Sequence, residues 1–233
     1  MKVIYTAIFG KYDDLKEPSF VTKGWKYVCF TDQDIASPVW EIRKVPVMDC
    51  GPAKTARYYK IMFHKHIETE FSIWIDGTFI INTDLNRWWK RFKEPFTAAQ
   101  HPYDNCIYKD AESCMSAGKG HLKTIERQIA LYKVIGIRKN SGLIASGMLM
   151  RQKTEAVKKF CKAWWNQVDQ WSERDQIAWG YANFLNPGVV NKIKWNYQEE
   201  REFWHVPHLH KKHRTLPTEK QLYDYGKLQS EQG

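Results

Sequence analysis

Phe71-Ser72-Ile73-Trp74-Ile75-Asp76-Gly77-Thr78 is the stretch that decides the fold. Its first five residues, mostly β-branched or aromatic, predict a strand covered on both faces of an α/β sheet, because such strands are almost continuously apolar. Asp76 and Gly77 follow at the carboxyl end of this strand, where open α/β sheets bind their ligands and where a glycine permits close approach. Asp-Gly is also a common turn, so a turn or a helix cap is the competing interpretation of Asp76.

The segments before this stretch predict more of the same sheet. Residues 2–9 and 25–32 are short apolar runs, and residues 40–45 alternate with period two, as a strand nearer the edge does. In the loop after the first run, Tyr12 could stack on a base, although a solvated turn explains it equally well. Asp32 ends the second run, in the place where such folds read a ribose or a base.

A helix is predicted from about Ala53 to His66, with Pro52 in its first turn. Lys54, Arg57 and Lys60 recur at spacings of three, which places them along one side of that helix. This cationic stripe could hold a diphosphate, and a solvated helix face is the competing interpretation.

The second half of the chain mixes helices with one long apolar segment. Residues 82–85 resemble a helix start, and the cations and aromatic rings of residues 87–93 follow it. Residues 96–120 are predicted to be mostly irregular and to serve as an acceptor loop. Residues 142–150 predict a core strand, and three helices are expected over residues 122–135, 154–171 and 172–184.

Composition limits the class of protein. The 233 residues include 43% hydrophobic and 15% aromatic residues, which excludes a disordered chain. The net charge of +10 favours an anionic partner or substrate. Five widely spaced cysteines and the absence of a signal-like start predict a cytoplasmic protein with reduced thiols, and the sequence has no apolar run long enough for a membrane span.

Six short motifs occur in an order that resembles an uncharacterised-domain family of GT-A glycosyltransferases, with members related to plant mucilage and to ceramidase. The resemblance covers residues 1–185 and extends more distantly to the glycogenin-type retaining enzymes. The motifs are Tyr5-Thr6-Ala7-Ile8-Phe9-Gly10-Lys11-Tyr12-Asp13, Cys29-Phe30-Thr31-Asp32, Trp74-Ile75-Asp76-Gly77, His101-Pro102, Ser146-Gly147-Met148-Leu149-Met150-Arg151 and Arg174-Asp175-Gln176.

The resemblance implies a single α/β domain over residues 1–215, of the GT-A type, with a Rossmann-like mixed central sheet flanked by helices and a polar tail over residues 216–233. It implies that the first half binds a nucleotide-sugar donor, such as a UDP sugar, and the second half an acceptor. The predicted donor-binding residues are Thr6, Ala7, Tyr12, Asp32, Lys54, Arg57, Lys60, Asp76 and Gly77. The predicted acceptor-binding residues are Arg87, Trp88, His101 and Gly147.

The resemblance also implies a divalent ion, Mn²⁺ or Mg²⁺, with one departure from the family pattern. Asp76 matches the first carboxylate of the metal-binding Asp-x-Asp, but Thr78 takes the place of the second. His208 or His210 could complete an octahedral site from the tail, and solvated histidines are the competing interpretation. If the ion is poorly held, the cationic stripe must stabilise more of the charge on the departing diphosphate.

In the same pattern, Asp175 either stabilises an oxocarbenium-like sugar or takes the acceptor proton, and Gln176 binds the sugar hydroxyls. A favourable charge at a helix start is the competing role for Asp175. We expect a nucleotide-sugar-dependent glycosyltransferase whose acceptor is a modified, hydroxymethylated base in DNA, because base chemistry needs cations and stacking rings. A saccharide or lipid-linked acceptor is the alternative, and a non-catalytic nucleic-acid-binding module is the alternative of another class.

Overall fold

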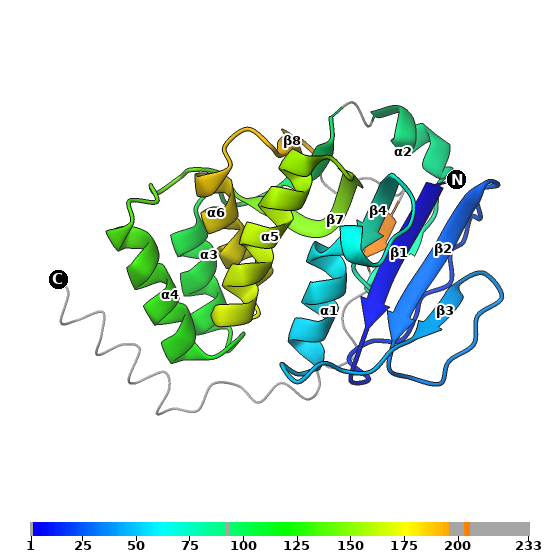
Figure 1. Cartoon of the computed structure of the whole chain (residues 1–233), viewed down its shortest axis with the longest axis horizontal. Coiled ribbons are helices and arrows are strands. Elements are labelled where there is room, and N and C mark those ends of the chain that lie inside the picture. Colours follow the sequence, from blue (N-terminus) through cyan, green and yellow to red (C-terminus); the bar gives the residue numbers. More distant parts are fainter. Residues whose placement is uncertain (1, 92–93, 196–202, 206–233) are drawn as a thin grey trace.

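A seven-stranded mixed sheet forms the centre of the structure, a computed structural model that describes residues 2–91, 94–195 and 203–205 (Figure 1). Its strand order is β3-β2-β1-β4-β7-β6-β8, and a second, two-stranded sheet joins β5 to β9. The strands are β1 Lys2–Ile8, β2 Trp25–Thr31, β3 Glu41–Lys44, β4 Phe71–Ile75, β5 Phe79–Ile81, β6 Phe96–Gln100, β7 Ile144–Gln152, β8 Asn191–Ile193 and β9 Phe203–His205.

The strand directions bring the carboxyl ends of six strands to one edge of the sheet. β1 to β4 are parallel to one another, whereas β7 is antiparallel to both β4 and β6. β6 therefore runs in the same direction as β4. β8 is parallel to β6, so the carboxyl ends of β1, β2, β3, β4, β6 and β8 lie at the same edge, together with the beginning of β7. Ligands of α/β sheets bind at such an edge.

Helices cover one face of the sheet, and the two-stranded sheet with α2 covers the other. The helices are α1 Pro52–Ile61, α2 Leu85–Arg91, α3 Ile107–Ser116, α4 Leu122–Val134, α5 Glu155–Gln170 and α6 Asp175–Leu185, with a short 3₁₀ turn at Phe63–Lys65. α1 and α5 lie side by side, and α6 packs on α5 (Figure 1). Thr154 caps α5 as predicted, since its side chain accepts a hydrogen bond from the Val157 amide.

The predicted strands and most of the predicted helices are confirmed, with two corrections. The helix predicted over residues 53–66 ends at Ile61, where the 3₁₀ turn takes over. The segment 96–120, predicted to be mostly irregular, contains β6 and α3, whose buried residues Ile107, Ala111 and Cys114 share one helix face. The fold class, a mixed central α/β sheet flanked by helices, is confirmed.

Two further predictions concern the ends of the chain and membranes. The polar tail predicted over residues 216–233 lies outside the described residues. Within the described ranges, no helix has the length and apolar character needed to cross a bilayer.

Candidate active site

Asp76 lies where β4 ends, at the sheet edge that collects ligands. Its amide donates a hydrogen bond of 2.8 Å to the Gly147 carbonyl of β7, which fixes the backbone there. Its Oδ1 accepts a 2.9 Å hydrogen bond from the indole Nε1 of Trp74. The side chain nevertheless remains 34% exposed, so the carboxylate is fixed through Oδ1 and is still accessible to a ligand.

Lys60, in the last turn of α1, joins Asp76 to the start of α6. Its side chain is only 1% exposed, and its ammonium nitrogen lies 3.2 Å from Asp76 Oδ1 and 2.6 Å from Asp175 Oδ2. It also donates a 3.1 Å hydrogen bond to Ser146 Oγ at the beginning of β7. One buried cation therefore binds two carboxylates that are 99 positions apart in the sequence.

Asp175 is the first residue of α6, and both of its carboxylate oxygens are occupied. Oδ1 lies 3.4 Å from Arg57 Nε, while Oδ2 accepts a 2.9 Å hydrogen bond from Ser146 as well as the contact with Lys60. The Trp164 indole donates a 2.7 Å hydrogen bond to the Asp175 carbonyl and anchors the helix start. The side chain is 4% exposed.

The two carboxylates are suited to different tasks. Burial alone raises the pKa of Asp175, but Lys60 and Arg57 outweigh it, so that the pKa lies well below its ordinary value. A general base needs a pKa near the working pH, so Asp175 is poorly suited to take the acceptor proton. None of the described residues donates to Oδ2 of Asp76, which makes Asp76 the carboxylate that can meet a ligand.

Two predicted glycines fit this site for packing reasons. A Cβ at Gly147 would lie 2.9 Å from the Phe79 ring and 3.5 Å from Asp76 Oδ2. A Cβ at Gly77 would lie 3.1 Å from side-chain carbons of Ile8, so the close neighbour of Gly77 in the structure is the end of β1. A side chain at either position would therefore crowd close-packed neighbours next to Asp76.

The predicted cationic stripe does not form a common surface. Lys60 is buried between carboxylates, and Arg57 contacts Asp175. Lys54 turns instead toward the end of α5, where it donates a 2.6 Å hydrogen bond to the Asp169 carbonyl. Arg57 and Lys60 therefore lie at the site and Lys54 lies apart from them, and the role of these residues toward a diphosphate stays a prediction. The competing interpretation of a solvated face is wrong for Lys60, which is buried.

The other predicted donor-binding residues lie at or near the same edge. Both oxygens of Asp32 accept from the Gly10 amide, at 3.1 and 3.3 Å, which ties the loop after β1 to the end of β2. Tyr12 in that loop is exposed, whereas Thr6 and Ala7 are buried within β1. Their roles toward a donor remain predictions.

The predicted acceptor residues separate into two groups. Trp88 is fully buried in the core, with its ring against Trp195 and Phe203, so the role of an acceptor-stacking ring is wrong for it. Its exposed neighbour Arg87 lies on the same short helix α2. The next residue, Trp89, packs on Phe71 at the amino end of β4. The α2 cluster is therefore remote from the edge that holds Asp76.

His101 and Gln176 lie on the side of the site where β6 and β7 meet that edge. His101 directly follows β6, and its amide donates a 3.0 Å hydrogen bond to the Leu143 carbonyl. Gln176 Nε2 donates a 3.0 Å hydrogen bond to the Ile144 carbonyl of β7. These two predicted residues share the neighbourhood of Ser146 and Gly147, and their roles toward substrate remain predictions.

The described residues do not by themselves make up the metal site that the sequence resemblance implies. Hard divalent cations take about six oxygen ligands, and Asp76 offers one uncommitted carboxylate oxygen. Thr78 is buried, and within the described ranges no group of three or more His, Cys, Asp or Glu side chains could hold an ion. His208 and His210 lie outside the described residues.

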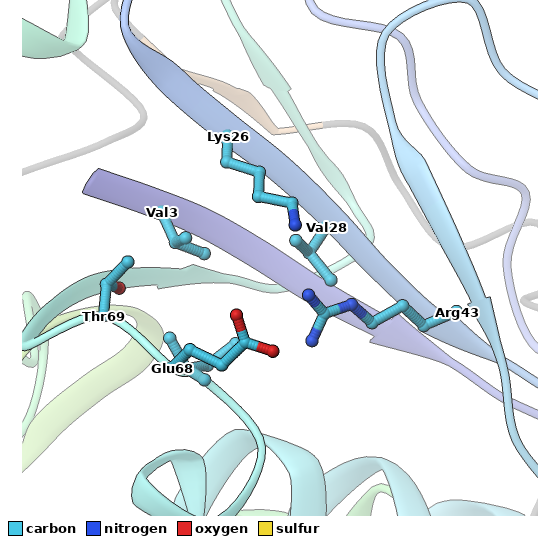
Figure 2. A pocket seen from close by; sticks show the side chains of 7 residues that line it. Val3, Lys26, Val28, Arg43, Glu68 and Thr69 are labelled. Carbon is cyan, nitrogen blue, oxygen red and sulfur yellow. The ribbon is translucent and has the colours of Figure 1, made fainter. Parts of the chain in front are cut away.

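A small pocket lies elsewhere, between β1, β2 and the segment before β4, lined by Val3, Lys26, Val28, Arg43, Ile67, Glu68 and Thr69. Figure 2 shows the Arg43 guanidinium and the Glu68 carboxylate facing each other across it. Val3 pairs with Ser72, four residues before Asp76, so the pocket lies roughly 13 Å from Asp76 along the strand. Lys26 and Arg43 both bind Glu41, which makes this pocket an ion-paired surface remote from the site.

Sequence reasoning missed Ser146 as part of the site and the contact between Lys60 and Asp175. Ser146 sits in a motif that the resemblance contains, but a serine at a strand start carries no signal of its own. Lys60 lies shortly before the Asp76 strand in the sequence, but its contact with Asp175 depends on tertiary packing.

The fold and the site define an α/β protein with a carboxylate at the end of a central strand, at the sheet edge where such folds bind their ligands. The chain belongs to the family described as TOD1/MUCI70, glycosyltransferase-like domain, which matches residues 33–213. It is 24% identical over 227 residues to a probable hexosyltransferase, MUCI70, of Arabidopsis thaliana. That match covers 83% of this chain and 38% of the relative, so the chain spans well under half of the relative's length.

Among solved structures, the chain resembles the galactosyltransferase LgtC, crystallised with donor and acceptor sugar analogues. The sequence identity is 12% and the TM-score is 0.42, with 82% of this chain and 73% of that chain covered. The family membership confirms the resemblance read from the sequence, and its matched range extends beyond residue 185, where that resemblance ended.

Proposed function

We propose that this chain transfers a hexose from a nucleoside-diphosphate sugar to a saccharide acceptor. Membership of a glycosyltransferase-like family and the likeness to a protein named as a probable hexosyltransferase support the reaction class. One structural observation carries the proposal. Asp76 follows a central strand, with one carboxylate oxygen fixed by Lys60 and Trp74, the other without a hydrogen-bond donor among the described residues, and the side chain 34% exposed.

In this reaction the bond between the sugar and the diphosphate breaks, and positive charge develops on the sugar ring. Asp76 can orient the donor through Oδ2, because Oδ1 is already held and the side chain cannot swing freely. Asp175 does not contact the donor in this proposal. It acts on Asp76 through Lys60, which binds both carboxylates. A preorganised carboxylate of this kind stabilises developing positive charge without reorganising during the reaction.

A saccharide fits the site better than the DNA base that the sequence suggested. The DNA prediction rested on the net charge, on the rings and cations of residues 87–93 and on the basic, histidine-rich tail, most of which lies outside the described residues. Trp88 is buried, and α2 packs near the amino ends of the strands. A continuous basic and aromatic track leading to Asp76 is therefore not formed by these residues.

Asp76→Asn tests the proposal, and Glu155→Gln, an exposed carboxylate paired with Lys158 at the start of α5, is its matched control. We expect Asp76→Asn to reduce sugar transfer by at least about 100-fold, as loss of a preorganised electrostatic group does, with little change in melting temperature. Glu155→Gln should retain wild-type transfer. Release of nucleoside diphosphate from a panel of UDP and GDP sugars measures the reaction, and undiminished activity of Asp76→Asn would refute the assignment.

A further inference from the structure

Tyr103 is the most exposed aromatic side chain among the described residues, with 75% of its surface accessible. Tyrosine rings are usually at least partly buried, because the ring gains free energy when it leaves water. A ring that remains on the surface is a candidate contact for a ligand that has both an apolar and a polar face. A pyranose has such faces, since its C–H groups form one side and its hydroxyls the rim.

The backbone of the loop that carries Tyr103 is fixed at both ends. The His101 amide binds the Leu143 carbonyl, and the Gly142 amide binds the Asn105 carbonyl at 2.9 Å, so the loop is tied to the segment that enters β7. Inside the loop, the Asp104 amide donates a 3.0 Å hydrogen bond to Nδ1 of His101. The ring of Tyr103 is thus presented by an ordered loop, which lowers the entropy that binding must overcome.

The loop lies at the sheet edge of the candidate active site. β6 ends at Gln100 and runs parallel to β4, with β7 between them, so the ends of the two strands are separated by about 10 Å. That separation is comparable to the length of one or two monosaccharide units. A saccharide chain resting on residue 103 can therefore extend a terminal hydroxyl toward a sugar held at Asp76.

His101 provides a polar contact beside the ring. Because its Nδ1 accepts the hydrogen bond from Asp104, the neutral imidazole carries its proton on Nε2 and can donate it to a hydroxyl. The two rings are edge-to-face, with centroids 6.2 Å apart. A stacking face and a hydrogen-bond donor next to each other are what a sugar ring requires.

We propose that residues 101–105 form the acceptor subsite, in which Tyr103 stacks on a pyranose ring of a saccharide and His101 donates a hydrogen bond to one of its hydroxyls. This inference rests on the proposed function and adds the location and chemistry of acceptor binding. The acceptor class that it selects is a neutral or weakly charged oligosaccharide, because recognition depends on a ring face and hydroxyls.

The test compares Tyr103→Ala, Tyr103→Phe and the control Phe184→Ala. Phe184 is also an exposed aromatic residue, but it lies at the far end of α6, roughly 13 Å along the helix from Asp175. The acceptor is first identified by incubating the wild-type chain and a radiolabelled sugar nucleotide with a broad oligosaccharide array. We expect Tyr103→Ala to raise the KM for that acceptor about tenfold with a smaller change in kcat.

Tyr103→Phe should restore the KM to within about threefold of wild type, because it keeps the ring, and Phe184→Ala should match wild type. An unchanged KM in Tyr103→Ala, or an equal increase in Phe184→Ala, would overturn the inference. Release of diphosphate by the wild-type chain without acceptor tests the proposed function alone. If the donor is consumed but no saccharide on the array is modified, the proposed acceptor subsite is refuted, whereas the proposal that the chain uses a sugar nucleotide is still supported.

Discussion

Replacing Lys60 by methionine tests the buried charge cluster most directly. Methionine keeps most of the length of lysine and removes its charge, so the change affects three polar contacts with little loss of volume. Asp175 would lose its 2.6 Å partner and stay 4% exposed, with Arg57 at 3.4 Å and the Ser146 hydroxyl as its remaining partners. Asp76 would lose a contact at 3.2 Å but keep its hydrogen bond from Trp74.

The magnitude follows from these contacts. Removing one partner of a buried ion pair costs about 3–5 kcal/mol, because the remaining charge is left without compensation. The remaining contact with Arg57 places the expected cost at the lower end, about 3 kcal/mol, and the partly exposed Asp76 adds less than about 1 kcal/mol. For a chain of this size, a loss of 3 kcal/mol lowers the melting temperature by about 6–12 °C.

The pH dependence gives the prediction a second readout. In the wild-type chain the folded-state pKa of Asp175 lies below its unfolded value of about 3.9. Its contribution to stability is therefore complete above pH 4 and is lost as the pH falls through the folded-state pKa. In Lys60→Met mainly Arg57 opposes the effect of burial, so we expect the folded-state pKa of Asp175 to rise above its unfolded value. Protonation of Asp175 should then reduce the deficit of the variant as the pH is lowered from 7 toward 4.

Urea unfolding followed by circular dichroism at pH 7 and pH 4.5 measures both effects. Lys54→Met is the matched control, because Lys54 lies on the same helix, is partly exposed and binds only the Asp169 carbonyl among the described residues. We expect it to change the free energy of unfolding by less than about 1 kcal/mol. The reasoning fails if Lys60→Met resembles Lys54→Met at pH 7, or if its deficit does not shrink on acidification.

Two further predictions concern other parts of the chain. Gly147→Ala should lower the transfer rate at least about tenfold, because its Cβ would displace the Phe79 ring at 2.9 Å beside Asp76; an unaltered rate would contradict this packing. Burial and neighbouring charges lower the pKa of both His64 and His66 to about 4. Stability should therefore rise between pH 4 and 6.5, and urea unfolding of the double variant His64→Gln/His66→Gln should give a flatter profile than wild type.

The central strands could be predicted because burial on both faces leaves a direct mark on the sequence. β1, β2 and β4 are apolar runs bounded by glycine or aspartate, and the position of Asp76 at the end of β4 followed from that pattern alone. α5 could be predicted for a similar reason, since its cap and its apolar face are both local features. Local patterns identify such elements because the apolar positions repeat with the period of the strand or helix itself.

The error over residues 96–120 shows how composition can hide an amphipathic helix. Asp, Asn, Ser and Gly are frequent there and suggested turns, but the apolar positions of α3 recur at helical spacing and are buried against α4 and α6. Tyr108 was part of that signal, and its hydroxyl donates a 2.7 Å hydrogen bond to the Ile137 carbonyl. Counting apolar positions against the helical period would have identified α3.

The role of Lys60 could not be predicted, because the spacing of charges along a helix does not say what packs against them. Lys54 and Lys60 belong to the same apparent stripe, yet one binds a carbonyl at the surface and the other lies in the core of the site. What separates them is the start of α6, more than 100 residues later, which places a carboxylate against the last turn of α1. Contacts of that range are set by the fold.

This arrangement also explains why two carboxylates can lie at one site without repelling each other. Lys60 and Arg57 supply two positive charges for Asp76 and Asp175, so the cluster is neutral as a whole. Asp175 holds Lys60 in place, and Lys60 in turn fixes one oxygen of Asp76 while the other remains available. The chemistry of the site therefore depends on Asp76 directly and on Asp175 through an intervening cation. Loss of Asp175 should thus disturb the orientation of Asp76 even though the two side chains share no direct contact.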